Sequence, residues 1–497
     1  MTRLPIAVAT AMLALHPLAA RSQAGAVARD TSPEQLGTVH LATSCSRGVA
    51  VSFDRAVALL HSFEFGESIR TFGSVIATDP TCAMAYWGIA LSKWTNPMAP
   101  GERPVALLRE GRAAVDSAER LAAHATMREQ GYIRAVGELY RDFEHVDQRT
   151  RVVAYERAMK DLALREPADT EAAIFHAIAL TASASPTDKT YANQLEAGAI
   201  LEALWAKEPN HPGLAHYIIH TYDYPPLASR ARAAAERYAS IAPSAAHALH
   251  MPSHTFTRLG MWQESASANA RSMTIALSNG SIAEALHAAD YAMYADLQMG
   301  RESDAKAILD ALPAMAARFD PAAVTGAAPG SAGVFALAAI PARWVLERGA
   351  WKEAAAIEPR RSDFPYTDAM SYFARALGAS HTGDLPRARA LIDSLASIEQ
   401  RLGASGEQYW TEQVAIQRLA AQSWLELAEH RSADALAHMR EAAATVGFPT
   451  IMKPIFDAGS ADTSQVTHQA ELDAAIKAVR HVAVVSVEEF IEGREVY

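Results

Sequence analysis

The feature that most constrains the fold is a pattern of paired amphipathic helices that repeats along most of the chain. Within residues 53–94, apolar side chains recur at three- and four-residue spacing in three successive segments, and Asp79-Pro80 separates the last two. This spacing is typical of helices that bury one face. A proline returns in the same place of the pattern at Pro209 and again at Pro243. One such hairpin buries only part of its apolar surface, so we expect successive hairpins to stack on one another.

Glycines mark a second turn in each repeating unit. Gly260, Gly300 and Gly349 each lie between two amphipathic segments, and Gly383 lies in a weaker copy of the same pattern. With these prolines and glycines, the chain resembles the tetratricopeptide repeat (TPR) family, whose unit is a helical hairpin of about 34 residues. The broader resemblance is to exported bacterial proteins of that family. It implies an all-α fold, namely a right-handed α-solenoid of TPR-like helical hairpins with a concave face.

The N-terminus has the features of a secretory signal peptide. One arginine precedes an apolar run, and small residues offer a cleavage site near Ala24. No later segment has about 18 uninterrupted apolar residues, so we expect no membrane span in the mature chain. The expected organisation is a signal peptide at 1–24, an N-terminal extension at 25–50, a repeat array with a histidine-rich groove at 51–319, a linker or long loop at 320–332, further hairpins at 333–446 and a C-terminal tail at 447–497, where the pattern does not decide between helix and strand.

The two cysteines of the chain, Cys45 and Cys82, are a candidate disulfide. Each precedes the first helix of a hairpin, and adjacent packed helices are about 8–10 Å apart, which brings such positions within bridging range. The alternative is two buried thiols. A disulfide and a signal peptide both indicate an exported protein, either periplasmic or secreted.

Charge excludes some classes of partner. The net charge is −11, and no basic stripe is present, so the sequence lacks the electrostatic footprint of a protein that binds nucleic acid or an anionic membrane. Repeat arrays of this kind usually bind a peptide or protein segment in the concave groove, and that is the partner we expect. The sequence does not indicate an oligomeric state.

Histidines are concentrated in two places. Of 18 histidines, six lie within residues 211–220 and 247–254. His216 and His220 form one HxxxH pair, and His250 and His254 form another, one repeat further along the chain. Residues four apart in a helix project from the same face. In the TPR family the corresponding positions line the concave groove, so the resemblance implies that both pairs face it.

Paired imidazoles at this spacing suit a transition metal. The two pairs give either a four-nitrogen site or a three-nitrogen site with an open position, and a site with two metals is a further alternative. A thiolate-free set of imidazoles suits Zn, Cu, Fe or Ni without choosing between them. The full set of candidate ligands is His216, His220, His250, His254, His287 and Asp290, where Asp290 either binds the metal or fixes an imidazole.

Further residues map to the groove without an assigned ligand role. They are His247, Tyr294, Trp87 and Trp94, and the two tryptophans form either an aromatic pocket or ordinary core packing. His211 precedes its helix, and we expect it to be structural. Two functions remain open: an exported scaffold with a metal site, or a metalloenzyme, such as a metal-dependent hydrolase or oxidase. The sequence does not decide whether the protein is an enzyme.

Overall fold

The computed structural model describes residues 34–446, except 100, 186, 187 and 189, together with the backbone of four short strands between 450 and 496. The expected signal peptide at 1–24 and much of the tail lie outside the described residues. The helices of the first half are α1 Ala50–His61, α2 Phe65–Thr78, α3 Ala83–Trp94, α4 Val105–Leu121, α5 Met127–Tyr140, α6 Gln148–Arg165, α7 Thr170–Ala182, α8 Ala192–Trp205, α9 Pro212–Thr221, α10 Arg232–Ile241, α11 Ala246–His250 and α12 Pro252–Arg258. Those of the second half are α13 Trp262–Asn279, α14 Ile282–Gln298, α15 Glu302–Arg318, α16 Gly330–Leu346, α17 Trp351–Ala356, α18 Pro365–Thr382, α19 Leu385–Ala404, α20 Gln408–Ala428 and α21 Ser432–Val446. Three 3₁₀ turns, at Arg47–Val49, Ala122–His124 and Ala228–Ala231, complete the helical elements of the described residues.

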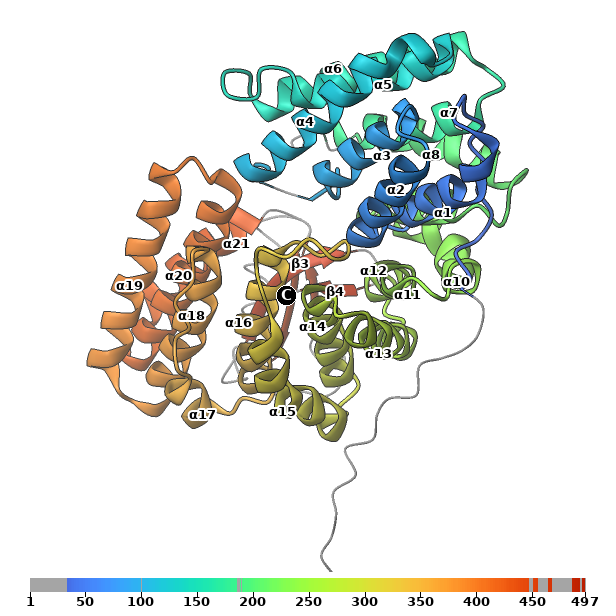
Figure 1. Ribbon diagram of the computed structural model, residues 1–497. Coiled ribbons are helices and arrows are strands. Elements are labelled where there is room, and N and C mark those ends of the chain that lie inside the picture. The colour runs from blue at the N-terminus through green and yellow to red at the C-terminus, as the bar shows by residue number, and fades with distance from the viewer. Residues whose placement is uncertain are drawn as a thin grey trace, which may run out of the picture. The chain divides into compact units, whose positions relative to one another are not determined.

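Successive helices pack against one another along the array (Figure 1). The predicted glycine turns separate the helices of a hairpin, and each glycine has a left-handed backbone, with φ of 65° at Gly260, 67° at Gly300, 60° at Gly349 and 82° at Gly383. Glycine adopts this conformation without the steric cost that a Cβ brings. The all-α solenoid of helical hairpins is therefore confirmed for the helical part of the chain.

The array also makes a contact that a simple stack of repeats does not predict. Helix α1 packs against α9, although seven other α-helices lie between them in the sequence. The N-terminal extension follows the same path, since the Thr38 N–H donates to the carbonyl of Asn210 at 2.9 Å. In an open solenoid each repeat contacts only its neighbours. Here the first hairpin instead closes on a later one, and the histidine-bearing helix α9 lies at that closure.

Residues 319–329 join α15 to α16 without helical structure, and α16 begins at Gly330. This loop packs on the array. The carbonyl of Thr325 accepts the Gly66 N–H at 3.0 Å, and the Ala328 N–H donates to Glu284 Oε2 at 2.8 Å. Helix α14 also contacts α16 directly, and one hydrophobic cluster runs from Ala246 to Ala374 across both sides of the loop.

Cys45 and Cys82 lie at disulfide distance, with their sulfurs 2.03 Å apart. The pair links the segment before α1 to the residue that precedes α3. At the other end of the chain the strands β1 Thr450–Pro454, β2 Ser464–Val466, β3 Val485–Ile491 and β4 Arg494–Val496 form an antiparallel sheet in the order β2-β1-β3-β4. The segment near the end of the tail is therefore a strand.

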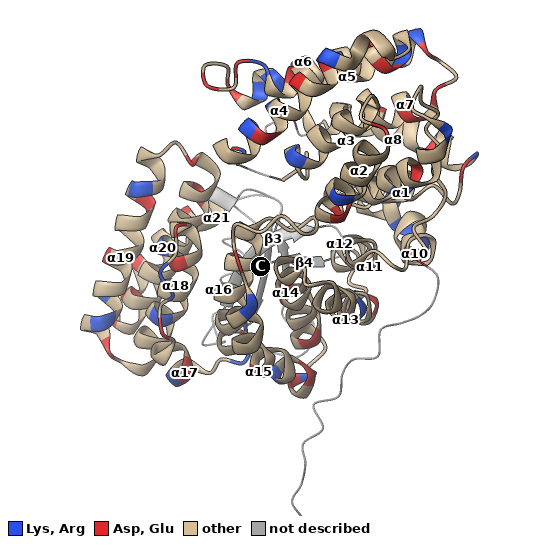
Figure 2. Cartoon of the chain, viewed as in Figure 1, with Lys and Arg blue, Asp and Glu red and all other residues tan. Residues whose placement is uncertain are grey.

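Positions of Lys and Arg and positions of Asp and Glu are interspersed along helices such as α6 and α19 (Figure 2). Helix α11, which carries two of the histidines, has no Asp, Glu, Lys or Arg and is tan throughout in that view. Helix α9 likewise has no charged residue of these types. Within the described residues, no helix is both long enough and apolar enough to cross a membrane.

Candidate metal centre

The first histidine pair lies on α9, a helix that begins with proline. Pro212 occupies the first turn, where its missing N–H costs nothing, and its fixed φ favours the helical conformation. His216 and His220 then lie one turn apart on the face that meets the first hairpin. The ring of Phe63, from the turn after α1, packs 4.5 Å from His216 and 5.5 Å from His220, measured between ring centroids.

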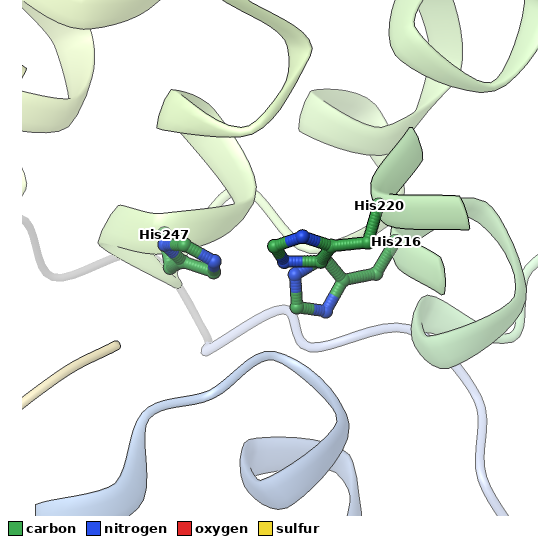
Figure 3. A group of neighbouring side chains, drawn as sticks. All are labelled: His216, His220 and His247. Atoms are coloured by element: carbon green, nitrogen blue, oxygen red, sulfur yellow. The ribbon is translucent and has the colours of Figure 1, made fainter. Parts of the chain in front are cut away.

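His247 from α11 joins this pair (Figure 3). We call His216, His220 and His247 the inner triad. One nitrogen of each ring lies within 4.8 Å of the corresponding nitrogens of the other two. His216 and His247 are 0% and 3% exposed. The Nε2 atoms of all three rings are buried and have no hydrogen-bond partner among the residues that the structure describes.

The other nitrogens of two of these rings are engaged. His216 Nδ1 lies 2.6 Å from the carbonyl oxygen of His61, and His247 Nδ1 lies 2.9 Å from Glu284 Oε1. Because both partners are acceptors, each Nδ1 must carry the proton and donate it. The tautomer therefore leaves the Nε2 lone pair free on each ring, as on histidines that bind metals through Nε2.

Electrostatics keep His216 and His220 uncharged. Burial lowers the pKa of His216 and His220 well below the ordinary value, and a positive charge on a neighbouring histidine lowers it further. Neutral imidazoles supply lone pairs for a metal, whereas imidazolium does not. Three buried ring nitrogens without hydrogen-bond partners are costly in an apolar interior, and a shared cation would satisfy all three.

We call His250, His254 and His287 the outer triad. One nitrogen from each of these rings also lies within 4.8 Å of the others. His250 Nε2 and His254 Nε2 are 3.0 Å apart. The ring centroid of His287, from α14, lies 4.5 Å from that of His250. The two triads are neighbours, because the centroids of His247 and His250 are 5.8 Å apart.

This grouping differs from a four-nitrogen site built from the two HxxxH pairs. The ring centroids of His220 and His254 are 6.3 Å apart, and each pair takes its third histidine from another place in the chain. The helix that carries the second pair is interrupted between α11 and α12, where Pro252 cannot donate to the preceding turn. His247, which was expected in the groove without a ligand role, belongs to the inner triad.

A third group is His61, Glu171 and His211. Its ligand atoms already bond to one another, since His61 Nε2 and His211 Nε2 lie 2.8 and 3.0 Å from the two oxygens of Glu171. His61 Nδ1 bonds to the Tyr217 hydroxyl at 3.0 Å. Burial raises the pKa of Glu171, but the two histidines outweigh it and hold the pKa far below its usual value. This network joins α1, α7 and α9, consistent with the structural role expected for His211.

Asp290 and Tyr294 do not join either triad. Asp290 Oδ1 lies 2.8 Å from Arg343 Nε, and its other oxygen faces the same guanidinium at 3.5 Å. The carboxylate of Asp290 is thus engaged in an ion pair with Arg343, and Asp290 is not among the residues that make up the triads. Tyr294 is buried, with its ring 5.4 Å from Trp262 and under the Arg343 guanidinium. It is thus a packing residue next to the site.

The two tryptophans predicted for the groove are in the interior. Trp87 is 1% exposed and packs edge-on against Tyr132 and Phe175, so it belongs to the core. Trp94 is 3% exposed and lies below the guanidinium of Arg103. It also borders a cavity of about 460 Å³. Neither tryptophan lies with the histidines.

Several residues around the triads were not predicted from the sequence. Glu284 holds His247, and Glu64 Oε1 accepts the backbone N–H of His247 at 3.3 Å. Burial and the nearby Glu284 raise the pKa of Glu64 to about 8. Asp223 and Asn269 hold the outer triad. The sequence contains one indication of the role of Glu284. This residue lies three positions before His287 on the buried face of a largely apolar helix.

The fold and the site together define a helical-repeat protein with two neighbouring clusters of three histidines. No family model and no curated protein matches the chain. A solved structure described as Naa15/Naa10 bound to HypK-THB is similar at a TM-score of 0.22 and 12% identity, over 80% of this chain and 66% of that one. The chain therefore spans slightly less than two thirds of the length of that protein.

Proposed function

We propose that this protein binds a transition metal ion through the Nε2 atoms of His216, His220 and His247. The observation that carries the proposal is the set of three buried Nε2 atoms without a hydrogen-bond partner among the described residues, on rings that each place one nitrogen within 4.8 Å of the other two. The His61 carbonyl orients the ring of His216 and the Glu284 carboxylate orients that of His247, which is the arrangement that metal-binding histidines use. The all-imidazole donor set suits Zn, Cu, Fe or Ni.

We propose further that the protein is exported and that its array serves as a scaffold for a peptide or protein segment. Export is supported by the leader pattern at 1–24 and by the Cys45–Cys82 pair, which suits an oxidising compartment. The proposal of a partner is supported by the cavity of about 460 Å³ beside Trp94. This cavity is bordered by Arg103, Arg149 and Glu407. The alternative function, a metal-dependent hydrolase or oxidase, is favoured by the partial exposure of the outer triad, where the His254 side chain is 15% exposed.

The metal proposal is tested by elemental analysis of protein purified from its native compartment without chelator or nickel resin. The wild-type chain is expected to contain close to one or more equivalents of a transition metal. The variant His220→Gln is expected to lose metal, and His145→Gln, which changes an exposed histidine bonded to Asp142, is expected to keep it. Added metal should raise the melting temperature of wild type more than that of His220→Gln, because binding to the folded state alone stabilises it and the variant lacks a ligand of the inner triad.

The proposal is abandoned if the wild-type protein contains no transition metal and its melting temperature does not respond to Zn²⁺, Cu²⁺, Ni²⁺ or Fe²⁺. It is also abandoned if His220→Gln and wild type bind metal equally well. Far-UV circular dichroism of the variants confirms that each remains helical.

A further inference from the structure

The outer triad, like the inner triad, contains ring nitrogens whose lone pairs are free. The groups that orient its rings differ from those of the inner triad. His250 Nδ1 lies 2.7 Å from Asn269 Oδ1. The orientation of that amide is fixed, because Asn269 Nδ2 donates to the Ser265 carbonyl at 2.8 Å and its Oδ1 also accepts from the Ser253 hydroxyl at 3.3 Å. His250 Nδ1 must therefore carry a proton and donate it.

His254 is held in the same way by a carboxylate. His254 Nδ1 lies 2.9 Å from Asp223 Oδ2, while Arg258 Nε donates to Asp223 Oδ1 at 2.9 Å. The arginine keeps this carboxylate ionised, so it can only accept from the imidazole. Both rings thus donate through Nδ1 and turn their Nε2 atoms toward each other.

Two neutral imidazoles in these tautomers would place two lone pairs 3.0 Å apart. Lone pairs repel at that distance unless a cation lies between or beside them, and the cation is either a proton or a metal ion. A tetrahedral metal at about 2.0–2.1 Å from both nitrogens would set them roughly 3.3 Å apart. The third ring, His287, offers a nitrogen within 4.8 Å of both, which a shared proton does not require.

We propose that His250, His254 and His287 bind a second transition metal ion next to the inner triad, and that this ion keeps a coordination position for water or a small anion. The inference rests on the proposed function, because it assumes a metal-binding chain. Two observations carry it, namely the opposed Nε2 atoms of His250 and His254 and the partial exposure of the site to solvent. The His254 and Asp223 side chains are 15% and 22% exposed, whereas His216 is fully buried. Three protein ligands with access to solvent are the pattern of a metal site that is open to exchange.

The two proposed sites have different consequences for the molecule. The inner ion would be enclosed by α9, α11 and the first hairpin, and it would hold those elements together. The outer ion would be reached from solvent along the side where His254 and Tyr291 lie, with the Tyr291 hydroxyl 3.5 Å from His254 Nδ1. We therefore assign ligand exchange to the outer triad.

Titration of metal-free protein with Co²⁺, followed by visible absorption, tests this. Wild type is expected to bind two equivalents, and His254→Gln one. Azide is expected to shift the Co²⁺ bands of wild type and to leave those of His254→Gln unchanged. His287→Gln serves as a second variant if His254→Gln does not fold, since His287 belongs to the same triad. The matched control is His40→Gln, which changes an exposed histidine bonded to Asp54 and should behave as wild type.

The outcomes separate the two proposals. If wild type binds one equivalent of Co²⁺, and both His254→Gln and His287→Gln still bind it, the outer site is overturned and the inner site stands. His250 and His254 would then share a proton. No Co²⁺ binding at all would overturn both. Two equivalents with no response to azide would overturn the open coordination position.

Discussion

At the scale of single residues, the proposed metal binding depends on which nitrogen of each imidazole is engaged. In the inner triad, Nδ1 of His216 and of His247 is bonded to an acceptor, and the Nε2 atom of each of these rings is buried without a hydrogen-bond partner among the described residues. Glu284 matters most among the residues outside the triad, because it is the only charged group bonded to a ring of the inner triad within the described part of the chain. Burial raises the pKa of Glu284, but His247 outweighs that effect and keeps the pKa below its usual value, so the carboxylate stays ionised.

Replacing Glu284 with glutamine is therefore expected to weaken metal binding by about 10–100-fold, the usual cost of losing a partner that orients a ligand. The amide retains the size of the carboxylate but holds the His247 N–H less strongly. A competition titration against a chromophoric chelator measures the affinity. Glu302→Gln is the matched control, because Glu302 is an exposed residue paired with Arg348. An affinity for Glu284→Gln equal to that of wild type would contradict the role given to this carboxylate.

The sequence predicted the histidines better than it predicted their grouping. The HxxxH spacing identified His216, His220, His250 and His254, because helical periodicity is local and visible in one segment. The groups depend on contacts between repeats, and no local pattern encodes those. Asp290 occupies the position in the repeat that lines the groove, but its carboxylate pairs with Arg343 on another helix. His247 was expected in the groove, and its ring centroid lies 5.0 Å from that of His216 and 6.0 Å from that of His220 because α11 and α9 come together in the fold.

At the scale of helices, small residues decide how closely neighbouring elements approach. Gly88 lies on the buried face of α3, where a Cβ would come within 2.2 Å of the Phe72 ring of α2. Phe72 is fully buried and packs against Phe53, so its ring has little room to move. Gly73 lies within α2, and a Cβ there would meet nothing within 4 Å.

Alanine at these two positions is expected to have opposite effects on the free energy of unfolding. Gly88→Ala should destabilise the protein by about 1–3 kcal/mol, because it overpacks the interface between α2 and α3. Gly73→Ala should stabilise it by roughly 0.5–1 kcal/mol, since alanine loses less backbone entropy in a helix. Denaturant unfolding followed by circular dichroism measures both changes. If Gly88→Ala proves as stable as Gly73→Ala, the close packing of these helices is wrong.

At the scale of the whole molecule, the fold class can be predicted from the sequence repeat. The closure of the first hairpin on α9 cannot. A regular repeat predicts stacked hairpins, and the glycine and proline turns lie where its period places them. The contact of α1 with α9 and the packing of Thr325 on Gly66 join segments that lie far apart in the sequence. Such contacts have no period to reveal them. They matter because Phe63 and the His61 carbonyl, both contributed by the first hairpin, complete the inner triad.

The central claim is that the inner triad holds a metal ion, and anomalous X-ray scattering from crystals of the mature protein tests it most directly. The protein is purified without chelator, and data are collected above and below the absorption edge of the metal that elemental analysis identifies. We expect an anomalous peak about 2.0–2.1 Å from the Nε2 atoms of His216, His220 and His247. The claim would be contradicted if those three atoms were bonded to ordered water and no anomalous peak lay between them.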